Sequence, residues 1–279
     1  MPEPLRLALV ADIHHGEDKL TKRGGAALGL LDRFLAFAGD WGADMIVDLG
    51  DRISDKDAAT DARLLADVAA VFTGLNTPHA HLNGNHDVAF LGQEANARAL
   101  GEALGGRVVI LKGWRLIFWQ ADSHIPFPET FRIGQADLDW LEATLQASDL
   151  PTVIFTHVPL GGGSMTGNMW FQNNPEFAGY PNADAARALI QAHGRVVLCV
   201  SGHVHWNSLN RIDAIPYITI QSLTEGFATG GEAAEAWATL ELDETIRWRT
   251  HGRDPIEMVL PLRQPGEHWS PPLRPFRRA

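Results

Sequence analysis

The chain has 279 residues, of which 45% are hydrophobic and 20% are charged, a composition typical of a globular protein with a large core. Its formal net charge of −11 would repel a polyphosphate backbone, which argues against duplex nucleic acid as a partner. The single cysteine, Cys199, excludes an internal disulfide, and no apolar run reaches the length of a membrane span. We therefore expect a cytoplasmic protein without a membrane partner.

Short apolar runs alternate with helical patterns over the first 200 residues. Runs of strand length occupy residues 5–11, 45–49, 108–111, 116–119, 153–155 and 196–200. Between them, apolar residues recur at helical spacing over residues 26–38, 58–72, 134–145 and 183–192. This alternation predicts an α/β core with crossover helices.

The pattern changes after residue 207. Short alternating segments at residues 208–212, 217–220, 236–242 and 246–250 predict a β-rich C-terminal part. The chain from residue 255 onward is rich in Pro and Arg, which favours an extended segment that packs on the body or on another subunit of a homo-oligomer. We accordingly divide the chain into a domain over residues 1–254 and an extension over residues 255–279.

Residues 159–181 form a long glycine-rich and aromatic stretch without a regular period. Loops of this length within a compact domain are usually functional or disordered. Because the stretch begins two residues after His157, we interpret it as a lid over a substrate, with a mobile surface insertion as the alternative.

Polar side chains follow several of the predicted strands, where open α/β sheets bind their ligands. They occur in five short motifs and comprise Asp12, His14, Asp51, Asn85, His157, His203 and His205. Residues two apart in an extended chain point to the same face, so each D-x-H or H-x-H pair can hold one ion. Each motif alone is weak, but the ordered set of five predicts a site for two metal ions.

The mixture of Asp, Asn and His ligands suits manganese, iron or zinc, since magnesium and calcium prefer oxygen ligands alone. A carboxylate can bridge two ions about 3.5–4 Å apart, and Asp51 is the candidate bridge. Such a centre lowers the pKa of bound water and supplies a hydroxide for in-line attack on phosphorus. His86 is not needed as a ligand, so we assign it as the catalytic residue that stabilises the developing charge or protonates the leaving oxygen.

Contacts with the substrate are less defined by the sequence. His15 follows a ligand, His124 follows a strand-like run, and Asn168 and Trp170 lie in the predicted lid, where an aromatic face could stack on a base. Lys19, Lys22 and Arg23 could reach a phosphate, although a solvated charged loop is the more common explanation for such a run.

The motifs D-I-H at Asp12, G-D at Asp51, G-N-H-D at Asn85, the isolated His157 and G-H-V-H at His203 resemble the signature of calcineurin-like metallophosphoesterases. The resemblance implies a four-layer α/β/β/α sandwich and a catalytic histidine at His86. It also implies two ligand sets that share Asp51: Asp12, His14, Asp51 and His205 for one metal, and Asp51, Asn85, His157 and His203 for the other.

Two further features refine this resemblance. Residues 121–126 (A-D-S-H-I-P) and 135–141 (Q-A-D-L-D-W-L) are similar to the bacterial branch of cyclic-nucleotide and glycerol phosphodiesterases. Many relatives also carry an aspartate three residues after the bridging one, where it orients the catalytic histidine. Here Ser54 occupies that position and Asp55 follows it, so the sequence leaves the partner of His86 open.

The favoured function is therefore hydrolysis of a small phosphodiester by a binuclear metal centre. The same residues would also serve a phosphomonoesterase or a nucleoside-diphosphate pyrophosphatase. A metal-bound interaction scaffold without activity is a remote alternative, and the presence of His86 argues against it.

Overall fold

The computed structural model describes residues 2–274 and contains two six-stranded mixed sheets. The first sheet has the order β12 (Glu257–Pro261), β11 (Thr245–His251), β10 (Trp237–Leu242), β1 (Leu5–Val10), β2 (Met45–Asp48) and β3 (His79–His81). The second has the order β4 (Arg107–Leu111), β5 (Trp114–Phe118), β6 (Thr152–Phe155), β7 (Val196–Ser201), β9 (Ile215–Thr219) and β8 (Ser208–Ile212).

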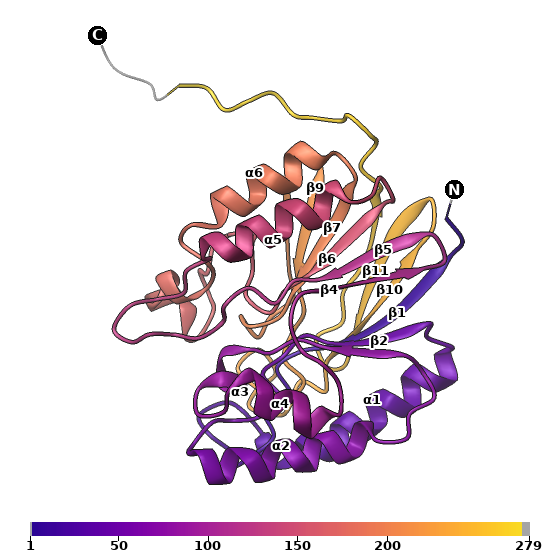
Figure 1. The fold of residues 1–279 in the computed structure, drawn as a ribbon. Coiled ribbons are helices and arrows are strands. Elements are labelled where there is room, and N and C mark those ends of the chain that lie inside the picture. Colours follow the sequence, from indigo (N-terminus) through magenta and orange to yellow (C-terminus); the bar gives the residue numbers. More distant parts are fainter. Residues whose placement is uncertain (1, 275–279) are drawn as a thin grey trace.

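Helices cover the outer faces of the two sheets. The first sheet carries α1 (Ala27–Trp41) and α2 (Ala58–Phe72), and the second carries α5 (Gln135–Gln146) and α6 (Ala183–His193). Figure 1 shows these two helical layers on opposite sides of the sheets. The structure therefore confirms the four-layer α/β/β/α arrangement that the family resemblance implied.

Local sequence explains where the helices begin and end. Asp57 caps α2, because its Oδ1 accepts a hydrogen bond from the backbone N–H of Thr60 at 2.9 Å. Helix α1 ends at Gly42, whose φ of 73° lies in the left-handed region that glycine adopts without steric cost. Both helices bury one apolar stripe against the first sheet.

The central core lies between the two sheets. Trp114 on β5 and Trp248 on β11 are its largest side chains, and both have no exposed surface. Strands β1, β2, β6 and β7 are buried along most or all of their length, since these inner strands are covered on both faces. This packing fixes the two sheets relative to each other, and thereby the loops that leave their strand ends.

The predicted strands and crossover helices are present, with bounds that shift by a few residues. Sequence analysis did not identify strand β3, the one-turn helix α3 (Asn85–Val88), α4 (Gln93–Leu100) or strand β12. The described chain after residue 207 is β-rich, as predicted. Its strands join both sheets: β8 and β9 extend the second, whereas β10, β11 and β12 extend the first.

Strand β12 is the edge strand of the first sheet, although it falls within the predicted extension over residues 255–279. Beyond it, the buried guanidinium of Arg263 lies 2.8 Å from Asp213, which also accepts a hydrogen bond from the backbone N–H of Trp269. The beginning of this tail thus contacts the body, while residues 275–279 lie outside the described range.

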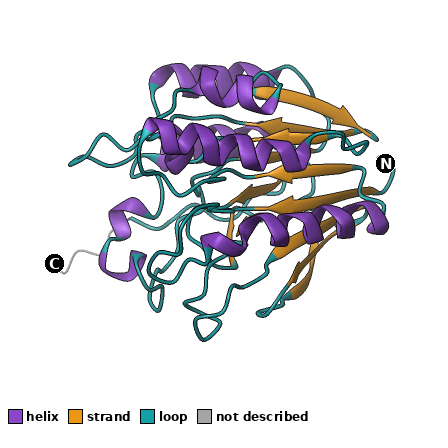
Figure 2. Ribbon diagram, turned by 90° about the horizontal axis from the view of Figure 1, so that it is seen from below, coloured by secondary structure: helices purple, strands orange, loops and turns teal. Residues whose placement is uncertain are grey.

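Between residues 2 and 274, no helix combines the length and the apolar character needed to cross a bilayer. The long loops gather at one end of the two sheets (Figure 2). That end carries the polar motifs.

Candidate metal centre

The seven predicted ligands all lie on loops that follow strands or at the start of a short helix. Asp12 and His14 follow β1, Asp51 follows β2, and Asn85 begins α3 shortly after β3. In the second sheet, His157 follows β6, and His203 and His205 follow β7. Because β1, β2 and β3 are parallel to one another, as are β6 and β7, their carboxyl ends bring the polar side chains of both sheets together.

The backbone at these ligands is not extended as the sequence argument assumed. Five of the seven adopt left-handed conformations: Asp12 (φ 51°), His14 (49°), Asp51 (56°), His203 (73°) and His205 (58°). Non-glycine residues rarely adopt positive φ, and such positions cluster at functional sites. The spacing of two therefore brings the ligands together through left-handed turns beyond the strand ends.

Two glycines of the motifs are needed because of close approach. Gly84 has an extended backbone, which any residue could adopt, so its conformation alone does not require glycine. A Cβ atom at Gly84 would overlap the carboxylate of Asp51, and one at Gly202 would lie 2.7 Å from Oδ2 of Asp12. A larger residue at either position would displace a ligand.

The first cluster consists of Asp12, His14, Asp51 and His205. The Nε2 atoms of His14 and His205 lie 2.9 Å apart. Oδ2 of Asp51 lies 3.8 Å from Nε2 of His14, and Oδ1 of Asp12 lies 3.5 Å from Nε2 of His205. One ligand atom from each residue falls within 4.8 Å of all the others. Since His and carboxylate ligands bind zinc at about 2.0–2.2 Å, this spacing fits a single shared ion.

The second cluster shares Asp51 with the first. Asp51, His157 and His203 place ligand atoms within 4.8 Å of one another. Nε2 of His157 lies 3.4 Å from Oδ2 of Asp51 and 3.3 Å from Oδ1 of Asn85. The structure thus brings the side chains of each implied ligand set close together, with Asn85 beside the second cluster.

Backbone carbonyls orient two of the histidines. Nδ1 of His157 donates to the carbonyl of Leu49 at 2.8 Å, and Nε2 of His203 donates to the carbonyl of Phe177 at 2.7 Å. A carbonyl can only accept, so each bond places a hydrogen on the outer nitrogen and turns the other nitrogen toward the cluster. Such outer hydrogen bonds fix the tautomer and orientation of metal-binding histidines.

Glu225 orients His205 and was not identified from the sequence. Its Oε2 accepts a hydrogen bond from Nδ1 of His205 at 2.9 Å, which turns Nε2 of that ring toward His14. Burial raises the pKa of Glu225, but the hydrogen bond and charge of His205 outweigh it and lower the pKa to about 2. Glu225 therefore stays ionised, and it adds negative potential behind the first cluster.

The buried carboxylates set the electrostatics of the site. Burial raises the pKa of Asp12 to about 6, against the charges of His205 and His157. Burial also raises the pKa of Asp51, but the neighbouring His157 and His86 outweigh it and hold the pKa well below its usual range. Burial lowers the pKa of His157, yet the charge of Asp51 prevails and raises it to about 9. The potential at Nε2 of His157 thus attracts a proton, and it would attract a metal cation in the same way.

His86 lies beside both clusters. Its backbone N–H donates to Oδ1 of Asp51 at 2.9 Å, and its ring meets that of His14 edge-on with centroids 4.8 Å apart. Nδ1 of His86 is hydrogen-bonded to Oδ1 of Asp55. The aspartate one residue beyond the expected position therefore pairs with this histidine, whereas Ser54 donates to the backbone carbonyl of His14.

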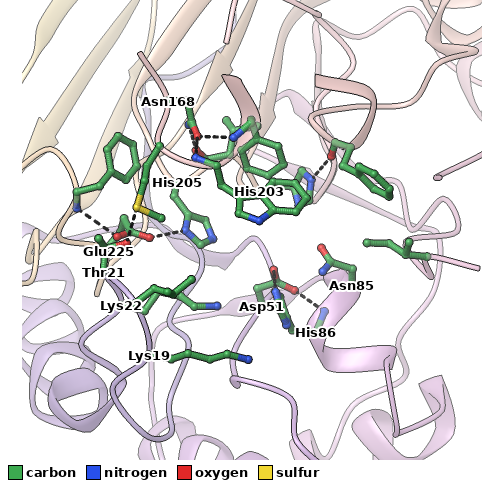
Figure 3. Close-up of a pocket in the computed structure, with 18 residues that line it drawn as sticks. Lys19, Thr21, Lys22, Asp51, Asn85, His86, Asn168, His203, His205 and Glu225 are labelled. Atoms are coloured by element: carbon green, nitrogen blue, oxygen red, sulfur yellow. Dashed lines mark hydrogen bonds and ion pairs between the residues drawn. The ribbon is translucent and has the colours of Figure 1, made fainter. Parts of the chain in front are cut away.

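A cavity of about 400 Å³ opens over the two clusters. Asp51, Asn85, His86, His203 and His205 lie at its base, as Figure 3 shows. Its walls are largely apolar and include Leu20, Ile125, Met169, Trp170, Phe171, Phe177 and Phe227. Several of these belong to residues 159–181, so this segment does flank the cavity.

The predicted substrate residues divide into two groups. Trp170 is half-exposed on the cavity wall. Asn168 also lines the cavity, but its buried amide is occupied by backbone groups of Val204, Trp170 and Phe171. Its role is thus to hold the lid segment.

His15 and His124 do not line this cavity, as far as residues 2–274 are concerned. The left-handed backbone of His14 turns His15 toward α2, where its Nε2 lies 3.4 Å from Asp67. His124 is exposed on the following loop. By contrast, Lys19 and Lys22, for which a solvated loop was the more common explanation, both line the cavity.

Comparison with known proteins agrees with this geometry. A protein of Synechococcus described as a probable cyclic nucleotide phosphodiesterase is 27% identical over 209 residues, which cover 74% of this chain and 75% of the relative. A dimetal phosphatase from Danio rerio shares the fold with a TM-score of 0.72 at 16% identity, covering 92% of this chain and 99% of that one.

The same fold occurs in the Plasmodium protein GAP50, described as the anchor in the inner membrane complex, with a TM-score of 0.60 at 15% identity over 95% of this chain and 90% of that one. The fold is thus shared by proteins with different descriptions, and the site has to carry the functional argument. The model of calcineurin-like phosphoesterases matches residues 5–207, which contain all seven predicted ligands and His86. The chain belongs to the calcineurin-like phosphoesterase family.

Proposed function

We propose that this protein hydrolyses small phosphodiesters with a binuclear metal centre. The observation that carries the proposal is the pair of ligand clusters that share Asp51, with His86 beside both at the base of one cavity. Membership of the phosphoesterase family supports phosphate-ester hydrolysis, and the curated relative supports the diester.

In this proposal Asp12, His14, Asp51 and His205 hold one ion, and Asp51, Asn85, His157 and His203 hold the other. Mixed nitrogen and oxygen donors favour manganese, iron or zinc. Two such ions would supply an activated water as nucleophile and would neutralise charge on the phosphate. The protein contributes the fixed tautomers of its histidines and the negative potential of Asp51 and Glu225.

His86 is the proposed general acid. The Asp55 carboxylate accepts the hydrogen on Nδ1 and directs Nε2 toward Asp51, whose Oδ2 lies 3.9 Å away. Burial raises the pKa of Asp55, but the hydrogen bond and charge of His86 outweigh it, so Asp55 remains ionised. With Nδ1 held by Asp55, Nε2 is the ring nitrogen that faces the clusters and would donate a proton to the leaving oxygen.

The cavity walls support an ester with an organic substituent. Trp170, Phe177 and Phe227 line the space above the clusters, and aromatic faces of this kind bind the apolar or aromatic part of a ligand. A diester carries such a group on both sides of the phosphorus. The lysines at the cavity favour a second candidate, the phosphomonoester, because its dianion gains more from two cations than a diester monoanion does.

A matched pair of substrates separates these candidates. We expect the metal-replete protein to hydrolyse bis(p-nitrophenyl) phosphate with a higher kcat/KM than p-nitrophenyl phosphate, and to act on a cyclic nucleotide or glycerophosphodiester. A preference for the monoester of more than about tenfold would replace the diester proposal with the second candidate.

His86→Ala tests the catalytic role. We expect kcat to fall by about 10²–10⁴-fold, while metal content measured by mass spectrometry stays at the wild-type value. His124→Ala is a matched control, because this exposed histidine lies outside the cavity lining. Unchanged turnover of His86→Ala would contradict the role of His86 as general acid.

A further inference from the structure

A short hairpin over residues 19–22 lies directly after the first ligand pair. The backbone N–H of Lys19 donates to the carbonyl of Lys22 at 3.1 Å, and the reverse bond measures 2.9 Å. Leu20 in the turn has a φ of 53°. Lys22 also forms a β-bridge with Glu225, the residue that orients His205. The hairpin is thus tied by its backbone to the support of the first cluster.

The chain has four lysines, and they fall into two classes. Lys56 and Lys112 lie 3.3 and 2.7 Å from the carboxylates of Glu17 and Asp44. Lys19 and Lys22 form no salt bridge with any residue between positions 2 and 274, and both line the cavity. Within the described residues, the two lysines that form no salt bridge are therefore the two that line the cavity.

The side chains of the hairpin point into the site. Figure 3 shows Lys19 and Lys22 reaching toward Asp51 and His86 from the side opposite Asn168 in the lid segment. A phosphate above Asp51 would therefore lie between the lid on one side and the two ammonium groups on the other.

Hydrolysis of a phosphate ester requires positive charge beside the phosphate. A phosphodiester carries one negative charge, and attack by an anionic nucleophile adds a second, which the monoester product retains near neutral pH. Lysine is a compact, strongly charged donor suited to phosphate oxygens, and a charge-assisted hydrogen bond is stronger than a neutral one.

We propose that Lys22, assisted by Lys19, binds the non-bridging oxygens of the phosphate from the side opposite the lid and determines how strongly the site prefers dianionic over monoanionic phosphates. This inference rests on the proposed phosphoesterase function and assigns Lys22 as a specificity residue. It explains how an acidic chain can bind an acidic substrate.

The test uses Lys22→Gln, Lys19→Gln, the double variant and Lys22→Arg in the metal-replete protein. Lys56→Gln is the matched control, because it removes a lysine whose charge Glu17 already offsets. The probe is inorganic phosphate, with its dissociation constant measured by titration calorimetry and the bound metals counted by mass spectrometry.

We expect Lys22→Gln to weaken phosphate binding by about tenfold, Lys19→Gln to weaken it less, and the double variant to weaken it most. Lys22→Arg, which keeps the charge, should stay within about threefold of wild type. The ratio of kcat/KM for p-nitrophenyl phosphate to that for its bis ester should fall in Lys22→Gln, because the dianion depends more on the cation.

Phosphate binding by the double variant within about twofold of wild type would overturn the proposal. Equal losses of phosphate affinity in Lys22→Arg and Lys22→Gln would also overturn it, since the shape of the side chain rather than its charge would then be responsible. Loss of metal from Lys22→Gln would overturn it as well. The proposed diesterase activity has a separate test: it would be contradicted if the wild-type protein did not hydrolyse diesters. In that case the measurements of phosphate binding would still test the role of the two lysines.

Discussion

Asp55 shows how a residue shifted by one position in the sequence can still contact His86. It contacts Nδ1 of His86 even though Ser54 occupies the position at which the family pattern places an aspartate. The loop after Asp51 allows this because Ile53 pairs with His15 in a β-bridge, and this pairing fixes the path of the following residues. The partner of His86 therefore lies one residue later in the sequence than the family pattern places it.

Asp55→Asn should lower kcat by about 10- to 100-fold, because a neutral amide holds Nδ1 of His86 less firmly than the carboxylate and orients the ring less well. Metal content should not change, since Asp55 belongs to neither cluster. Steady-state kinetics on the preferred ester, with Ser54→Ala as the matched control, measures the effect. A loss in Ser54→Ala as large as in Asp55→Asn would contradict the assignment.

Glu225→Gln should weaken metal binding by about 10- to 100-fold. The amide no longer supplies the negative charge that holds the Nδ1 hydrogen of His205 and supports its basicity. Competition with a chelator measures the affinity, and Glu232→Gln, which changes an exposed side chain of the same segment, is the control. Equal affinities of the two variants would show that Glu225 does not act through His205.

Sequence reasoning found the residues that follow regular strands and missed those placed by irregular loops. The seven candidate ligands were identified because each lies in a short motif, and most of these motifs directly follow a predicted strand. Glu225 lies beyond β9 in a segment without a motif, so nothing local connected it with His205. The charges of Lys19 and Lys22 were visible, but not the hairpin that points them into the cavity.

At the scale of elements, a buried amide attaches the lid segment to the site. Asn168 donates from Nδ2 to the carbonyl of Val204 at 2.9 Å, and its Oδ1 accepts from the N–H groups of Trp170 and Phe171 at 3.1 and 3.0 Å. Val204 lies between His203 and His205, so the lid is attached directly to the segment that carries two ligands. The positions of Trp170 and Phe171 in the cavity wall thus depend on the segment that carries His203 and His205.

Asn168→Ala should raise KM for an aromatic diester by roughly tenfold, because Trp170 would no longer be held in one place before the substrate binds. Hydrogen exchange over residues 165–177 should become faster in the same variant. Asn173→Ala, on the exposed part of the same segment, is the control. A normal KM together with faster exchange would show that the lid does not contribute to binding.

The elements that sequence analysis missed are short or lack a period. Strand β3 has three residues, of which two are histidines, and helix α3 has four. Neither is long enough to show the periodicity on which such predictions depend. Their presence follows from tertiary contacts, since β3 is completed by pairing with β2 and α3 by the buried carboxylate of Asp87.

At the scale of the whole molecule, the residues up to 207, which carry the motifs, do not form a complete folding unit. All seven ligands lie before residue 207, yet β10 lies between β1 and β11, and β9 lies between β7 and β8. Ile218, Leu240 and Trp248 from these later strands belong to the core between the sheets. The positions of the strand ends that carry the candidate ligands therefore depend on the strands after residue 207, which carry none of them.

A chain cut after Asn207 should consequently fail to fold, because both sheets lose inner strands and expose apolar faces. Circular dichroism during heating should show no cooperative transition. A chain cut after Ser270, which keeps β12 and the contacts of Arg263 and Trp269 with Asp213, should unfold cooperatively at nearly the wild-type Tm. A cooperative transition in the shorter chain would contradict this dependence.

The left-handed backbone at five ligands also limits which residues can replace them. Asp, Asn and His bind metals, and they are also the non-glycine residues that adopt positive φ most readily. Glycine would relax the backbone but offer no ligand atom, whereas glutamate at Asp51 would keep a carboxylate at a conformational cost of roughly 1 kcal/mol. Chemistry and conformation therefore select the same three side chains, and few single substitutions at these positions could satisfy both.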